Sequence, residues 1–136
     1  MTLKHGWLAF IDIDEFIMSY EDINDIVDKY SSEIGIKMPW KNFNSNGHKE
    51  RQFSTLLHYT QPCPIIEQDN TFNVKCFGNM DKLCVWTGPH DVIGAKRVEE
   101  IWVNHYITRS FEDYCFKIFE RGDVYFRVYR NLEAYL

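Results

Sequence analysis

A run of apolar residues, Trp7 to Ile11, lies near the start of the chain and is followed by Asp12. Continuously apolar runs of this length are typical of strands buried on both faces of a sheet. The run therefore predicts a central strand of an α/β domain. Apolar residues then recur at helical spacing from Ile23 to Tyr30, and this helix is expected to be capped by Ser19 and to stop at Gly35.

The middle of the chain alternates short strand patterns with turns. Residues 36–43 predict a second strand, in which Pro39 indicates an edge or a bulge. The stretch from Asn42 to His48 is rich in Asn, Ser and Gly, which predicts a loop whose backbone N–H groups are free for contacts. Residues 72–77 and 83–87 are expected to pair as a hairpin around Gly78-Asn79.

The C-terminal third predicts one more strand and two helices. The strand covers residues 97–106, and Ser110 caps the helix that follows. We expect that helix to end at Gly122 and a last helix to begin after Asp123. The predicted apolar face of the first of these helices consists of Phe111, Tyr114, Cys115, Ile118 and Phe119.

These elements predict one α/β domain over residues 1–136, with a mixed sheet and flanking helices. Hydrophobic residues make up 45% and charged residues 26% of the 136 positions, values that exclude a disordered or fibrous chain. Aromatic residues reach 16%, enough to fill the core of a domain this small. The sequence shows no internal repeat or linker.

Charge and cysteine content narrow the function classes. The net charge of -5 argues against a nucleic-acid binder, which needs a basic surface. The run Trp7 to Ile11 is the longest apolar stretch, too short to span a membrane. None of the four cysteines forms a C-x-x-C pair, so we expect them to be small buried residues in a reducing, cytoplasmic location.

Acidic residues gather where the first apolar run ends. Asp12 and Asp14 are separated by one residue, so they would leave a strand on the same side, with Glu15 as a third acid. Ligands of open α/β sheets bind at the carboxyl ends of the strands. A divalent cation relieves the repulsion between two such carboxylates, and hard oxygen ligands suit Mg²⁺ or Mn²⁺. The alternative is a pair of loop acids that cap backbone N–H groups.

Four segments, in order, resemble metal-dependent glycosyltransferases with a GT-A fold. The group is glycosyltransferase family 92 together with bacterial family 2-like enzymes, which carry D-x-D-E-F after an apolar strand, as at Asp12 to Phe16. Trp40 to His48 resembles the family loop W-x-x-F-G-x-x-G-H, and Thr87 to His90 resembles its P-H turn. Asn104 to Tyr114 resembles N-H-Y-x-T-K-S-x-E-E-F, followed here by Lys117 and Arg121-Gly122.

The sequence departs from that pattern at three points. Asn44 stands where the family has Gly, and Arg109 stands where it has Lys, which keeps the charge and changes its geometry. The D-x-D motif lies near the start of this sequence, whereas family members carry a nucleotide-binding half before it. We therefore expect the metal-binding and acceptor-side half of such an enzyme, with self-association or a partner chain to complete the fold.

The resemblance implies roles for particular residues. Asp12 and Asp14 would hold Mn²⁺ or Mg²⁺ against the diphosphate of a nucleotide sugar, and enzymes of this fold often add a late histidine, here His105 or His90. Each histidine is otherwise a hydrogen-bonded structural residue. Asp91 and Glu50 are candidates for the general base because each lies near a family-like histidine.

Further candidates would contact the substrates, a nucleotide-sugar donor and a glycan acceptor. Trp40 adjoins the polar loop and is suited to stacking on a sugar, while Gly47 and His48 lie within that loop. Arg109 offers a bidentate fork for a phosphate, unless it is a surface cation near the helix start. The other two tryptophans considered, Trp86 and Trp102, are core residues by default.

The sequence thus predicts a glycosyltransferase or part of one. Two alternatives stay open at this point. A haloacid-dehalogenase-like phosphatase also places D-x-D after an apolar strand, although it favours Thr or Val two residues after the second Asp, where this chain has Phe16. A non-catalytic remnant or binding module is the other. Turnover of a nucleotide sugar would distinguish the glycosyltransferase from the non-catalytic module, and release of phosphate from a phosphomonoester would favour the phosphatase.

Overall fold

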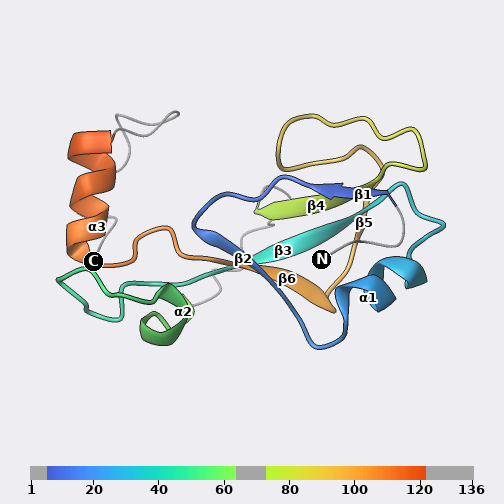
Figure 1. Cartoon of the computed structure of the whole chain (residues 1–136). Coiled ribbons are helices and arrows are strands. Elements are labelled where there is room, and N and C mark those ends of the chain that lie inside the picture. The colour runs from blue at the N-terminus through green and yellow to red at the C-terminus, as the bar shows by residue number, and fades with distance from the viewer. Residues whose placement is uncertain (1–5, 64–72, 122–136) are drawn as a thin grey trace. The chain divides into compact units, whose positions relative to one another are not determined.

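A computed structural model describes residues 6–63 and 73–121 (Figure 1). The expected stop at Gly122, the last helix and residue 72 of the expected hairpin lie outside these ranges. The described elements, in chain order, are β1 (Trp7–Ala9), β2 (Glu15–Ser19), α1 (Ile23–Lys29), β3 (Gly35–Asn42), α2 (Thr55–His58), β4 (Val74–Asn79), β5 (Lys96–Arg97), β6 (Ile101–His105) and α3 (Phe111–Cys115), which continues as a π-helical stretch, Phe116–Arg121.

The strands form a mixed sheet. Its order is β1-β4-β3-β6-β2, and β5 pairs with β3 beside this path. The pairs β1–β4, β3–β4 and β2–β6 are antiparallel, whereas β3–β5 is parallel. The predicted α/β class with a mixed sheet and flanking helices is confirmed, and the arrangement is compatible with part of a GT-A-like fold.

The first strand differs from its prediction. β1 stops at Ala9 and lies at one end of the strand order, so it is not central. Trp7 is buried, but Leu8 is 38% and Phe10 47% exposed. An apolar run indicates that a segment is buried, but it does not indicate how many strands lie beside it. The expectation of a strand buried on both faces was therefore wrong.

The expected hairpin around Gly78-Asn79 does not form. β4 pairs instead with β1 and β3, and residues 83–87 contribute only an isolated bridge between Trp86 and Val92. The indole of Trp86 packs on Gly78 so closely that a Cβ there would lie 2.7 Å from Trp86 Cζ2. Gly78 therefore allows the Trp86 side chain to approach the backbone of β4 closely, and it does not form a turn.

Other element boundaries also move. The strand expected over residues 97–106 divides into β5 and β6. Pro39 does not mark an edge, because β3 lies between β4 and β6 in the sheet and Pro39 pairs with Val74. A proline fits there because the next residue, Trp40, supplies the N–H that bonds to Asn73 O at 3.0 Å.

The first helix is capped by Asp22, not by Ser19. The Asp22 carboxylate accepts a hydrogen bond from the backbone N–H of Asn24 at 2.8 Å, while the Ser19 hydroxyl donates to Glu21 O. The helix ends at Lys29, and Gly35, expected as its stop, instead begins β3. The predicted apolar face is confirmed at Ile26 and Val27, which join the buried cluster. That cluster comprises Trp7, Ile26, Val27, Ile36, Met38, Phe77, Val98, Ile101 and Val103.

The chain divides into two compact units. The first comprises Met1–Lys41 and Ile65–His105, and thus the sheet and α1. The second comprises Asn42–Pro64 and Tyr106–Leu136. Within the second unit the polar loop is joined to α3, because the N–H of Phe111 donates to His48 O at 3.0 Å. The cap at Ser110 is confirmed, since its hydroxyl accepts from the N–H of Asp113.

The predicted apolar face of α3 is buried in part. Tyr114 is 2% exposed, but Phe111 is 39% and Phe119 69% exposed. The cysteines differ in the same way from their prediction. Of the four, Cys76 alone is buried, and Cys63, Cys84 and Cys115 are intermediate, all four being free thiols.

Candidate functional site

The paired carboxylates lie on a tight turn between β1 and β2. Ile13 and Asp14 form the turn, and the N–H of Glu15 donates to Asp12 O at 3.1 Å. The sequence pattern suggested that Asp12 and Asp14 leave a strand on the same side. Because they lie on a turn, the alternation of side chains along a strand does not set their direction. The turn leaves the Asp12 side chain 62% exposed, so that carboxylate is available to a ligand.

A buried lysine holds this turn. Lys75 Nζ lies 2.9 Å from Asp12 Oδ2 and 3.2 Å from Glu15 Oε2, although the Lys75 side chain is only 1% exposed. Glu15 Oε2 also accepts from the N–H of Asp12 at 2.9 Å. Sequence reasoning missed Lys75; its signal was one cation inside the otherwise apolar start of β4. A buried charge needs a partner, and here it has two carboxylates.

Burial also acts on Glu15. Its side chain is fully buried, and desolvation raises the pKa of its carboxyl even though Lys75 acts in the opposite direction. Glu15 Oε1 has no hydrogen-bond partner among the residues that the structure describes. Glu15 therefore anchors the turn from below, while Asp12 faces solvent.

Three of the predicted residues form a ring cluster in the first unit. The ring centroid of Trp40 lies 4.3 Å from that of His105 and 5.5 Å from that of His90. His105 is also the register partner of Glu15 across β2 and β6. Trp40 Nε1 and His90 Nδ1 are buried atoms without a hydrogen-bond partner in the described part of the chain. Buried polar atoms without a hydrogen-bond partner are uncommon in folded proteins.

The two candidate bases have different surroundings. Asp91 Oδ1 lies 2.7 Å from Lys37 Nζ and 3.8 Å from the thiol of Cys76, whose pKa burial raises to about 11. Glu50 belongs to the second unit and is exposed. Its side chain makes no ion pair within residues 6–63 and 73–121.

The residues present allow a divalent cation without a full protein cage. No group of three or more His, Cys, Asp or Glu side chains in the described ranges is placed to hold a metal ion. Mg²⁺-type sites commonly use one or two carboxylates and take their other oxygens from water and substrate phosphates. The chemistry of Asp12 and Asp14 fits this arrangement.

The polar loop of the second unit uses its own backbone donors. The N–H of Asn46 donates to Asn44 Oδ1, that of Gly47 to Ser45 Oγ and that of His48 to Ser45 O. The expectation of free N–H groups was wrong at these positions, because the side chains of Asn44 and Ser45 and the carbonyl of Ser45 accept these hydrogen bonds locally. Gly47 has a φ of 74° and nothing lies within 4 Å of where its Cβ would be, so it is open to solvent.

The side chain of His48 packs inside this unit. Its Nε2 lies 3.2 Å from His58 O, and its ring contacts that of Tyr59 with centroids 5.5 Å apart. These contacts make His48 part of the packing between the loop and α2.

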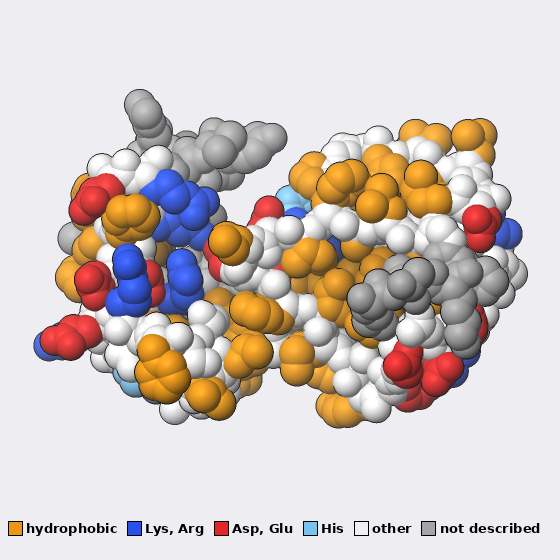
Figure 2. All heavy atoms as spheres, viewed as in Figure 1, with side chains coloured by type: hydrophobic (Ala, Val, Ile, Leu, Met, Phe, Trp, Pro, Cys, Tyr) orange, Lys and Arg blue, Asp and Glu red, His pale blue; other side chains and the backbone are white. Residues whose placement is uncertain are grey.

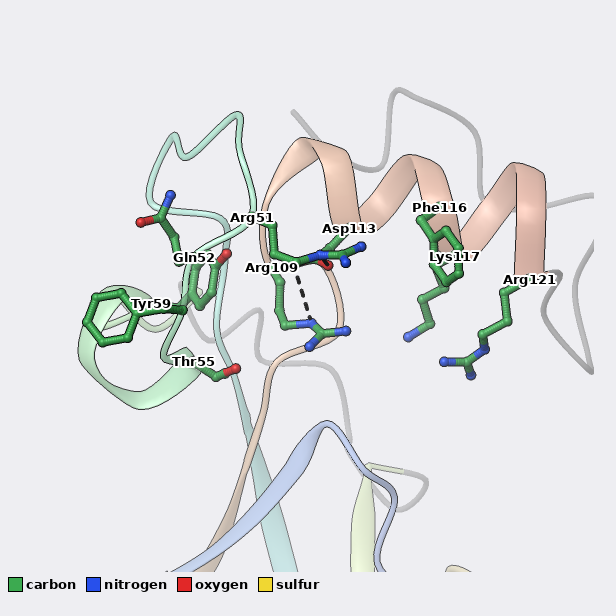
Figure 3. Close-up of a pocket in the computed structure, with 10 residues that line it drawn as sticks. Arg51, Gln52, Thr55, Tyr59, Arg109, Asp113, Phe116, Lys117 and Arg121 are labelled. Atoms are coloured by element: carbon green, nitrogen blue, oxygen red, sulfur yellow. Dashed lines mark hydrogen bonds and ion pairs between the residues drawn. The ribbon is translucent and has the colours of Figure 1, made fainter.

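Arg109 lines a basic pocket of about 340 Å³ in the second unit (Figure 3). Arg51, Lys117 and Arg121 line the same pocket, together with Asp113. The backbone of Arg109 has a φ of 50°, which lies in the left-handed region that residues other than glycine rarely adopt. The sequence signal for Lys117 and Arg121 was their helical spacing from Asp113, but Arg51 is distant in sequence and could not be assigned.

No curated protein and no solved structure matches the chain significantly. Among the described residues, no helix combines the length and apolar character that crossing a membrane requires. A family model, described as glycosyltransferase family 92, matches residues 2–134. Because that match covers nearly the whole sequence, the chain belongs to glycosyltransferase family 92.

Proposed function

We propose that this glycosyltransferase domain transfers a sugar from a nucleotide-sugar donor to a hydroxyl group of a glycan acceptor, with Mn²⁺ or Mg²⁺ as cofactor. The observation that carries the proposal is the turn that contains Asp12 and Asp14, in which the buried Lys75 contacts Asp12 and the buried Glu15. Asp12 is exposed there, whereas its supports are buried. The family match favours this function over the phosphatase alternative.

The turn would hold the cation through Asp12 and Asp14. Lys75 contacts Asp12 through Oδ2, which leaves Oδ1 for a cation. The metal ion, when bound, neutralises negative charge that develops on the leaving nucleoside diphosphate. The ammonium group of the buried Lys75 bonds to Asp12 Oδ2 at 2.9 Å and would hold this carboxylate in one orientation before the cofactor binds.

The acceptor would lie against the ring cluster of Trp40, His90 and His105. Sugar rings stack on aromatic faces, and these three rings lie close together. The acceptor oxygen forms a bond to the anomeric carbon as the bond to the diphosphate oxygen breaks. The hydroxyl proton passes to a carboxylate base, for which Asp91 is the candidate in the same unit as these rings.

Metal binding by purified wild-type protein tests the proposal. We expect Mn²⁺ to raise the melting temperature with a dissociation constant on the order of 0.1–1 mM, since few protein ligands contribute. Asp14→Asn should abolish most of that rise. Asp25→Asn is the matched control, because it removes the same charge from an exposed position on α1. Equal Mn²⁺ responses in Asp14→Asn and wild type would refute the assignment.

Turnover separates the function classes. We expect release of nucleoside diphosphate from at least one member of a panel of nucleotide sugars, in the presence of Mn²⁺ and glycan acceptors. Release of phosphate from a generic phosphomonoester, with no reaction of any nucleotide sugar, would instead establish the phosphatase alternative.

A further inference from the structure

The basic pocket of the second unit is not explained by the acidic turn or by the ring cluster. We propose that this pocket is a metal-independent binding site for a phosphorylated anion, with a diphosphate as the best match in charge. The residues that would bind it are Arg51, Arg109, Lys117 and Arg121. The proposal extends the phosphate contact expected of Arg109 to a whole pocket, and it requires neither Asp12 and Asp14 nor a cation.

The pocket gathers cations from two segments that are distant in sequence. Arg51 precedes α2, whereas Lys117 and Arg121 lie on the π-helical continuation of α3. Figure 3 shows that the ends of Arg109, Lys117 and Arg121 extend to the same side of that helix. The basic side chains also gather on one face in Figure 2. Cations held this close repel one another, and an anion between them removes the repulsion.

One carboxylate within the lining does not neutralise these cations. Asp113 is 7% exposed and is bound by Arg51 Nε at 2.7 Å, with Arg109 Nε 4.0 Å away. It thereby fixes both guanidinium groups from the buried side. The carboxylates of Glu112 and Glu120 also attract the Arg51 guanidinium electrostatically, but they do not line the pocket. Among the described residues that line the pocket, four are cationic and one is a carboxylate, so positive charge is in excess there.

The charge selects the class of anion. A single carboxylate would cancel only one positive charge, whereas a diphosphate carries several negative charges and offers many acceptor oxygens. Guanidinium forks bind phosphate oxygens in bidentate geometry, and charge-assisted hydrogen bonds of this kind are strong. The neutral lining residue Thr55 adds a hydroxyl donor for a further oxygen.

Calorimetric titration of the full chain with inorganic diphosphate in EDTA tests this site apart from the acidic turn. We expect binding that weakens with salt, because the contacts are ionic. Lys117→Gln or Arg121→Gln alone should weaken binding about tenfold, and the two together on the order of a hundredfold. Lys117→Arg should retain binding. Lys49→Gln is the matched control, an exposed lysine of the same unit outside the pocket.

The outcomes are distinct. Tighter binding of a nucleoside diphosphate than of inorganic diphosphate would support a donor as the source of the anion, and equal binding would support the diphosphate group alone. Acetate binding as tight as that of diphosphate would overturn the proposal, as would equal weakening by Lys49→Gln and Arg121→Gln. Arg121 makes no ion pair in the described ranges, so Arg121→Gln gives a result even if the double variant fails to fold.

Discussion

The acidic turn of the first unit and the basic pocket of the second are built on the same plan with opposite signs. In the turn, Lys75 is buried at 1% exposure and holds Asp12, which is 62% exposed. In the pocket, Asp113 is buried at 7% exposure and holds Arg51, which is 54% exposed. Each unit therefore places one charge inside and presents the opposite charge to solvent.

The difference between them lies in what surrounds the buried charge. Lys75 shares the interior with a second buried ion, Glu15, whose side chain is fully buried. Within the described ranges, Asp113 pairs with Arg51 and Arg109, whose side chains are 54% and 36% exposed, and it accepts a hydrogen bond from the Ser110 hydroxyl at 3.1 Å. Two ions inside the first unit make its pair costly to break, whereas the partners of Asp113 can return to water.

The largest expected effect follows from removing Lys75. Lys75→Met leaves Glu15 buried without its cation, so we expect the free energy of unfolding to fall by about 3–5 kcal/mol at neutral pH. Urea denaturation followed by circular dichroism measures the loss. The double variant Glu15→Gln, Lys75→Met should recover most of it, because no buried charge then remains. A loss in Lys75→Met no larger than that of an exposed lysine such as Lys82→Gln would contradict this account.

A smaller effect is expected in the second unit. Asp113→Asn removes the charge but keeps an oxygen for the N-cap contacts, and Arg51 returns to water. The free energy of unfolding should therefore fall by only about 1 kcal/mol, since one partner is exposed. The same denaturation experiment measures it. A loss as large as that of Lys75→Met would show that the two ion pairs are not different in kind.

The smallest expected effect is a slope with pH. Burial raises the pKa of Glu15 above its ordinary value of 4.5, so the folded state keeps this proton to a higher pH than the unfolded chain does. The stability that this carboxyl contributes is complete below pH 4.5 and is lost as pH rises through the raised pKa. Glu15→Gln removes that loss, so its stability relative to wild type should increase with pH in a urea series from about pH 4 to 7. A difference that is constant with pH would contradict the shift.

Local signals were predicted well. Ser110 was identified as a cap because the cap and its partner, the N–H of Asp113, are three residues apart. The buried face of α1 was recognised for the same reason, since its period is contained within the helix. Where competing caps stood close together, as with Ser19 and Asp22, spacing alone did not decide which side chain reached a helical N–H.

Signals that depend on distant residues were not predicted. β4 pairs with β1, and Trp86 packs on Gly78 of β4. Both Trp86 and β1 come from other parts of the sequence, so the residues of β4 alone did not predict these contacts. In the same way, Lys75 becomes a partner of Asp12 only once β1 and β4 are neighbours. The sequence indicated that acidic residues follow the first apolar run, but the cation beneath them comes from across the sheet.

The left-handed backbone of Arg109 has a consequence for laboratory evolution. A φ of 50° is unfavourable for arginine by roughly 1–2 kcal/mol and is tolerated far better by Gly or Asn. Selection for heat resistance alone would therefore enrich Gly or Asn at position 109. Each such winner would discard a guanidinium group, so a library screened for robustness would drift away from anion recognition while appearing to improve.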